Sequence, residues 1–186
     1  EVADVFLRAC GIARVDAFET LLEVAPLLAR VPAASARRRG RVGVITTTGG
    51  GAALAVDQLA ARGVDIVAPS AETRARLAAA GIETGEARIL DLTLAGTNYS
   101  VMRAAIEVLR AAPEFDLVQV CVGSSARFNP DLAVQPALDL IDTPGHPFAV
   151  LLVPDAPDAT RLLARAGVPV FEDPETCADA VAAALH

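Results

Sequence analysis

From residue 41 onward, short apolar runs alternate with stretches in which apolar residues recur every three or four positions. The runs have the length of buried strands, and the recurring pattern is typical of amphipathic helices. The runs predict strands at 42–47, 64–68, 116–122, 148–153 and 168–171. The patterns between them predict helices at 52–62, 71–80, 98–111, 130–141, 158–166 and 174–185. Residues 89–92 fit either a short strand or a loop.

Regular alternation of strands and helices predicts a parallel sheet with helices on both faces. The predicted fold class is α/β, a flavodoxin-like doubly wound parallel sheet of about five strands in a three-layer α/β/α arrangement. In such folds ligands bind outside the carboxyl ends of the strands, near the point where the strand order reverses. In the usual 2-1-3-4-5 order, the strands at 42–47 and 116–122 are neighbours. The loops that follow them are therefore expected to face each other.

The residues before 41 do not follow the alternation of strands and helices and are treated as a separate segment. A helix is expected at 1–10, ended by Gly11, and a second helix after Asp16, which we expect as its N-cap with Glu19 three positions on. We therefore predict an N-terminal helical appendage at 1–35, a linker at 36–40 and one α/β domain at 41–186. The arginines at 37–39 are interpreted as a solvated linker. Because the chain starts within a predicted helix and without Met, we expect a fragment of a longer protein.

The turn after the first predicted strand, residues 46–51, reads Thr-Thr-Thr-Gly-Gly-Gly and leads into a helix. A helix N-terminus leaves backbone N–H groups unpaired and carries the positive end of the helix dipole. Glycines let a ligand approach the backbone, so phosphate or carboxylate is the expected occupant. The alternative is a tight turn without ligand, and both standard nucleotide-binding fingerprints are absent. The candidate phosphate-binding residues are Thr47, Thr48, Gly49, Gly50 and Gly51.

Composition narrows the class of function. The net charge is −7 and no basic patch contains interleaved aromatic residues, which argues against a nucleic-acid partner. No apolar run approaches the ~20 residues of a membrane span. The three cysteines are far apart and form no metal-ligand motif, so we predict no metal site and a cytoplasmic location. Cys121 is expected in the core, and His146 in a solvated loop at a strand entrance away from the ligand edge.

Three segments, and the order in which they follow each other along the chain, resemble the NDP-forming acyl-CoA synthetases. This is the superfamily of succinyl-CoA synthetase and ADP-forming acetyl-CoA synthetase. Residues 42–63, with Asp57 in the helix, are similar to the family's Gly-rich strand–turn–helix segment. Residues 6–28 resemble the stretch that closes the family's preceding domain. Residues 168–185 resemble its C-terminal ending. Together these segments span nearly the whole chain.

The resemblance implies a reaction in which acid, CoA and NTP give acyl-CoA, NDP and phosphate through an acyl phosphate and a phosphohistidine. It implies that the Gly-rich helix N-terminus stabilises the phosphohistidine. It also implies that Gly123, Ser124 and Ser125 form the loop that holds the carboxylate of the substrate. The parent protein is expected to use CoA, ATP/ADP and Mg, and the partners are its CoA-binding Rossmann domain and ATP-grasp domain. A homo-oligomer is left open.

The chain departs from the family pattern in three places. The phosphohistidine of the family would lie upstream of Glu1, so no residue here is assigned as catalytic and the isolated chain is expected to lack ligase activity. The family's Asn-Pro-x-Asp-Leu segment is reduced to Asp91 and Leu92. The glycines are followed by Ala52 and Ala53.

Other functions stay open at this point. The first alternative is a non-catalytic regulatory or assembly domain of a degenerate acyl-CoA synthetase or of an acetyltransferase fusion. The second is an oligomerisation domain whose glycine turn binds nothing. A flavin protein is poorly supported, because few aromatic residues are present to stack on a flavin.

Overall fold

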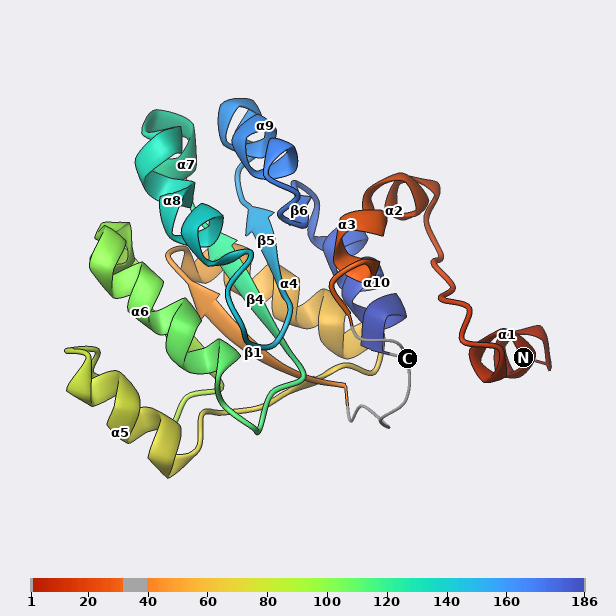
Figure 1. Ribbon diagram of the computed structural model, residues 1–186, viewed down its shortest axis with the longest axis horizontal. Helices are drawn as coiled ribbons and strands as arrows, with labels where there is room; N and C mark the ends of the chain where they lie inside the picture. The colour runs from red at the N-terminus through yellow and green to blue at the C-terminus, as the bar shows by residue number, and fades with distance from the viewer. Residues whose placement is uncertain (1, 32–39, 186) are drawn as a thin grey trace.

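A parallel sheet forms the middle layer of the computed structural model, which describes residues 2–31 and 40–185 (Figure 1). Within these residues the sheet has six strands in the order β2-β1-β4-β5-β6, and β3 also pairs with β1. The flavodoxin-like α/β fold is therefore confirmed. The strands are β1 (Arg41–Thr46), β2 (Asp65–Ile66), β3 (Ile89–Asp91), β4 (Leu117–Val122), β5 (Phe148–Leu152) and β6 (Val170–Phe171).

Two short strands share one side of β1. β2 pairs with Arg41 and Val42, and β3 pairs with Val44 through Thr46. Residues 89–91, which the sequence pattern left open, are therefore a strand. The strand expected at 64–68 is only two residues long in the ladder, because the second half of β1 is already paired with β3.

Helices cover both faces of the sheet (Figure 1). Successive residues of β4 point to opposite faces, so Val118 and Val120 pack into one buried cluster while Leu117 and Cys121 pack into the other. One cluster includes residues of α5 (Ala71–Ala79), α6 (Tyr99–Arg110), α8 (Pro130–Leu140) and α9 (Pro157–Arg165). The other includes residues of α4 (Gly49–Ala61) and α10 (Pro174–Leu185).

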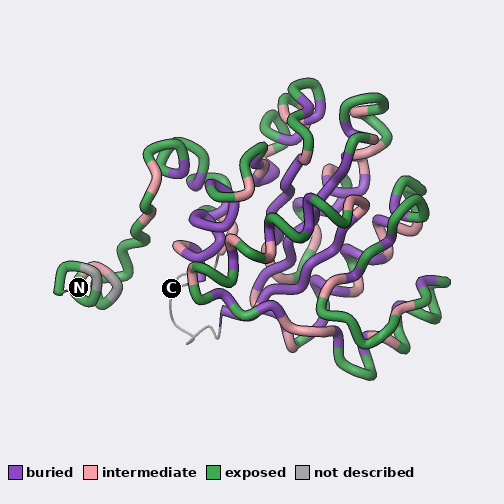
Figure 2. Tube along the Cα trace, turned by 180° about the vertical axis from the view of Figure 1, so that it is seen from behind, coloured by how far each residue is buried: buried purple, intermediate pink, exposed green. Residues whose placement is uncertain are grey.

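The N-terminal arm, residues 2–31, contains α1 (Val2–Ala9), α2 (Phe18–Glu23) and α3 (Ala25–Leu28). Val24 and Leu27 are buried in the same cluster as α10, which is therefore enclosed by the sheet, by α4 and by the arm. This position explains why α10 is apolar nearly all round. By contrast, α1 stands away from the sheet and is mostly exposed (Figures 1 and 2). The assignment of residues 1–35 to a preceding domain stays a prediction, and residues 36–39 of the expected linker lie outside the described residues.

The start of α2 differs from the sequence expectation. Its N-cap is Ala17, not Asp16, and no side chain of the arm caps the helix. Instead the backbone N–H groups of Asp16 and Ala17 donate to Oδ2 of Asp179 on α10, at 2.9 and 3.1 Å. The carboxylate of Asp16 lies 3.4 Å from the guanidinium of Arg14. The chain that enters α2 is thus held by a carboxylate from a distant helix, which local spacing does not reveal.

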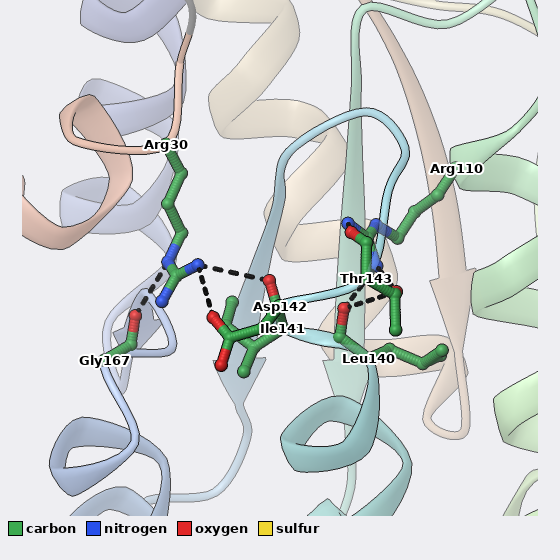
Figure 3. A network of polar contacts seen from close by, with 7 residues as sticks. All are labelled: Arg30, Arg110, Leu140, Ile141, Asp142, Thr143 and Gly167. Carbon is green, nitrogen blue, oxygen red and sulfur yellow. Dashed lines mark hydrogen bonds and ion pairs between the residues drawn. The ribbon is translucent and has the colours of Figure 1, made fainter.

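Two arginines hold the loops at the amino-terminal edge of the sheet, where the strands begin (Figure 3). Arg30, at the end of the arm, donates from Nε to the carbonyl oxygen of Gly167 and from Nη1 to that of Ile141, at 3.0 and 3.1 Å. Arg30 also lies 3.4 Å from the carboxylate of Asp142. These contacts fix the end of the arm to the loops after α8 and α9.

Arg110 is almost completely buried at the end of α6. Its guanidinium donates to the carbonyl oxygens of Leu140, Thr143 and His146 and to the hydroxyl of Thr143. It also lies 4.9 Å from the centre of the Phe148 ring. Burial lowers the pKa of Arg110, and repulsion from Arg30 lowers it further. The carbonyl oxygens that surround the guanidinium compensate its buried charge.

Arg110→Met is expected to lower the free energy of unfolding by about 2–4 kcal/mol, because several buried carbonyl oxygens lose their donor. Urea unfolding followed by circular dichroism measures this loss. Arg161→Met is the control, since Arg161 makes an exposed pair with Asp158 and its loss is expected to cost about 0.5 kcal/mol or less. Equal losses in both variants would contradict the structural role of Arg110.

Glu23, the last residue of α2, faces the turn between β6 and α10. Its pKa is raised, first by partial burial and then by repulsion from Glu172 and Asp173. Because the pKa of Glu23 is higher in the folded than in the unfolded state, the folded state binds the proton more tightly, and this difference contributes to stability at low pH. This contribution is lost as the pH rises through the pKa of the folded state.

Glu23→Gln is therefore expected to raise the melting temperature slightly near pH 7 and to have no effect near pH 3, below the ordinary pKa of a glutamate. Solvent screening of this exposed position limits the gain to about 0.5 kcal/mol. Thermal unfolding at both pH values measures it. A gain of the same size at both would show that the carboxylate charge is not the cause.

Candidate functional site

The Gly-rich turn and the loop at 123–125 meet at the carboxyl edge of the sheet. The turn follows β1, the loop follows β4, and these strands pair from Val42 with Leu117 to Thr46 with Cys121. The N–H of Gly123 donates to the hydroxyl oxygen of Thr47 at 2.9 Å, which joins the two segments directly. The expected juxtaposition of the loops is confirmed, whereas the binding roles of their residues stay predictions.

The helix after the turn begins within the glycines. α4 starts at Gly49 rather than at Ala52, and its first backbone hydrogen bond runs from the N–H of Ala52 to the carbonyl oxygen of Thr48. In the described part of the chain, nothing accepts a hydrogen bond from the N–H groups of Gly49, Gly50 or Gly51. Three backbone donors are thus left at the positive end of a helix of 13 residues.

The three threonines of the turn differ in their hydrogen bonds. The buried hydroxyl of Thr46 accepts from the N–H of Thr48 at 2.9 Å and donates to the carbonyl oxygen of Thr48 at 2.8 Å. The N–H of Thr48, which we expected to face the ligand, is therefore already used. The hydroxyl of Thr47 accepts from Gly123. Thr48 is the N-cap of α4, but its hydroxyl makes no cap bond.

Glycines next to the turn are required by close packing. A Cβ added to Gly51 would lie 2.8 Å from Cγ2 of Thr48 and 3.2 Å from Cβ of Val153. One added to Gly96 would lie 2.5 Å from Cγ2 of Thr47, and one added to Gly123 would lie 3.0 Å from Cβ of Thr48. The loops after β1, β3, β4 and β5 therefore interlock around the unpaired start of α4. We call this start of α4, together with the residues packed against it, the cradle. Gly96 and Val153 were not foreseen, because they lie outside every sequence motif.

Asp91 stands beside the start of α4, at the end of β3. One of its carboxylate oxygens accepts from the N–H of Thr93 at 2.9 Å, and Thr93 has a left-handed backbone with φ +46°. The other oxygen lies 3.7 Å from the position of a Cβ on Gly49. A negative charge is favourable at a helix N-terminus. Asp91 is thus part of the cradle, although we had not assigned it to the site.

The loop after β4 leads into a short helix, α7 (Ser125–Phe128), which begins at the second of its two serines. The N–H and hydroxyl groups of Ser124 and Ser125 have no hydrogen-bond partner in residues 2–31 and 40–185. The N–H of Gly123 is taken by Thr47, so the two serines supply the available donors. Arg127 lies 2.7 Å from the carboxylate of Asp155.

The remaining reactive side chains lie outside this edge or are buried. Burial raises the pKa of the Cys121 thiol to about 12, so this thiol is not a nucleophile near neutral pH. His146 lies in the turn before β5, where its backbone N–H donates to the backbone carbonyl oxygen of Arg110. This places it at the opposite edge of the sheet, as expected.

Amide N–H groups and hydroxyls at a helix N-terminus suit a phosphate group.

The described residues contain no group of three or more His, Cys, Asp or Glu side chains arranged to hold a metal ion. None of the helices they form is long and apolar enough to cross a lipid bilayer.

No protein-family model matches the chain, and no curated protein matches it either. Among solved structures, PH0766 from Pyrococcus horikoshii OT3 is similar, with a TM-score of 0.80 and 16% identity over 99% of this chain and 43% of that chain. A dinucleotide forming acetyl-coenzyme A synthetase 1 from Ca. Korarchaeum cryptofilum, in complex with phosphate and ADP, gives a TM-score of 0.75 and 19% identity over 98% of this chain and 40% of that chain. Its apo form gives the same values.

At these identities the likeness shows a shared fold. The chain spans less than half the length of these solved structures. The fold of this chain is therefore the fold of a part of longer proteins, one of which is an acetyl-CoA synthetase.

Gly50→Ala and Gly51→Ala are expected to have opposite effects on stability. An added Cβ at Gly50 meets no atom within 4 Å, so the helix preference of alanine stabilises the fold by up to about 1 kcal/mol. At Gly51 the Cβ collides with the Thr48 side chain and presses on Val153, and such overpacking costs about 1–3 kcal/mol. Urea unfolding of both variants measures the difference. Equal shifts in the same direction would show that the interlocked packing is wrong.

Proposed function

We propose that this chain is part of an NDP-forming acyl-CoA synthetase-like protein, in which it supplies a phosphate-cradling helix N-terminus and an acid-binding loop. The observation that carries the proposal is the unpaired start of α4 directly beside the loop at 123–125. The fold likeness to an acetyl-CoA synthetase that was solved with phosphate and ADP supports it.

In the proposed reaction, acid, CoA and NTP give acyl-CoA, NDP and phosphate through an acyl phosphate and a phosphohistidine. The N–H groups of Gly49, Gly50 and Gly51 bind oxygens of the phosphoryl group, and the hydroxyls of Thr47 and Thr48 donate to it. These donors stabilise negative charge that is otherwise solvated by water.

The carboxylate of the acid is held by the donors of Ser124 and Ser125, which stand next to the cradle. The carrier histidine, the CoA-binding Rossmann domain and the ATP-grasp domain belong to other parts of the parent protein. Those parts bring CoA, ATP/ADP and Mg. No residue of this chain is assigned a catalytic role, and its role is to bind and orient the phosphoryl and carboxylate groups.

The second candidate function is a non-catalytic regulatory or assembly domain. The observation that favours it is the carboxylate of Asp91, which lies beside Gly49. An internal negative charge at this position stabilises the start of α4 without a ligand. In this alternative the cradle is a structural remnant or an anion sensor.

The isolated chain, labelled with ¹⁵N, is expected to bind inorganic phosphate, with shifts of the amide signals of Gly49, Gly50 and Gly51. Gly50→Val introduces a branched side chain within the run of donors and is expected to weaken binding about tenfold or more. Gly85→Val is the matched control, because Gly85 is also exposed and free of neighbours within 4 Å. Absence of shifts in the wild type, or unchanged binding in Gly50→Val, would reject the phosphate cradle.

A second measurement separates the two candidate functions. If the parent protein carries the histidine, an acid-labile phosphohistidine forms from ATP, and Gly50→Val reduces its amount. Phosphate binding without any phosphohistidine in the parent protein would favour the regulatory or assembly domain.

A further inference from the structure

Thr47 contacts strand β4 and two of the loops that surround the cradle, the one after β4 and the one after β3. Its backbone N–H donates to the carbonyl oxygen of Cys121 at 3.0 Å, which extends the ladder between β1 and β4. Its hydroxyl accepts from the N–H of Gly123 at 2.9 Å. Its methyl group faces Gly96 so closely that a Cβ there would lie 2.5 Å away. The side chain is thus held on both of its branches.

Thr47 differs in this respect from the two threonines beside it. The hydroxyl of Thr46 is used entirely within its own turn. The side chain of Thr48 touches Gly123 by packing alone, which has no directional preference. Within the described residues, the bond that Gly123 donates to Thr47 is the only hydrogen bond between a side chain of the turn and the loop at 123–125.

The hydroxyl proton of Thr47 has no acceptor among residues 2–31 and 40–185. A hydroxyl carries one donor and two acceptor lone pairs. Because Gly123 occupies a lone pair and Gly96 confines the methyl group, the direction of the free O–H is limited. It is therefore a pre-oriented donor at the boundary between the cradle and the loop.

We propose that Thr47 is a positioning residue that sets the spacing between the phosphate cradle and the loop at 123–125, so that one ligand with adjacent phosphoryl and acyl oxygens contacts both. This inference rests on the proposed function. A ligand that joins both groups gains affinity over phosphate alone only when the two sets of donors are held at a matching separation.

The test compares two probes on the full chain by isothermal titration calorimetry. Inorganic phosphate reports on the cradle, and 2-oxopropylphosphonate, a stable analogue of acetyl phosphate, reports on the cradle and the loop together. The measured quantity is the ratio of the two affinities, because a general loss of stability or of phosphate binding cancels in it. The wild type is expected to bind the analogue about tenfold more tightly than phosphate.

Thr47→Val keeps the shape of the side chain and removes the acceptor for Gly123, so the ratio is expected to fall towards one. Thr47→Ser keeps the hydroxyl and is expected to retain the ratio. Thr143→Val is the matched control: the Thr143 hydroxyl also accepts a hydrogen bond, from Arg110 at 2.9 Å, but at the opposite edge of the sheet. It is expected to lower stability and leave the ratio unchanged.

Gly123→Ala tests the same spacing from the other side, since its Cβ would lie 3.0 Å from Cβ of Thr48 and displace the loop. Gly123→Ala is expected to lower the affinity ratio, and it replaces Thr47→Val as the test if that variant does not fold. A wild-type ratio in Thr47→Val, or in Gly123→Ala, would overturn the positioning role. A ratio near one in the wild type would overturn it as well and leave the cradle intact. If the wild type binds neither probe, the proposed function itself fails.

Discussion

The pairing of β1 with β4 at the centre of the sheet is the contact on which the rest of the molecule depends. These strands send alternate residues into two separate buried clusters, one beneath α6, α8 and α9 and the other beneath α4 and α10. The same pairing brings together the loops that leave both strands at their carboxyl ends. The register of β1 against β4 therefore determines both the packing of the core and the placement of the two loops of the candidate site.

At the carboxyl edge, small residues rather than long polar chains organise the site. Threonine methyl groups fill the space beside glycines, and threonine hydroxyls close the turn and join it to its neighbour. Such contacts restrict the backbone around the unpaired donors at the start of α4. Preorganised donors of this kind stabilise charge without reorganising. At the other edge, Arg30 and Arg110 fix the loops through carbonyl oxygens.

The alternation of apolar runs with helical patterns was sufficient to predict the parallel sheet and the adjacency of the two loops, because these follow from period and topology. Three features depended on distant partners and could not be predicted. β2 and β3 share one side of β1, Asp179 holds the backbone of Asp16 just before α2, and Thr46 accepts from the N–H of Thr48. Asp91 carried a weak signal, an acidic residue directly after an apolar pair, but its closeness to Gly49 required the fold.

The packing of Gly96 against Thr47 bears on how relatives of this chain should be compared. Gly96 lies 45 positions after the last glycine of the run, in a segment without any recognisable motif. A homologue can keep all three threonines and all three glycines and still have lost the geometry of the cradle, if a larger residue replaces this one glycine. The residue at position 96 therefore carries information on the packing of the turn that the threonine and glycine run alone does not carry.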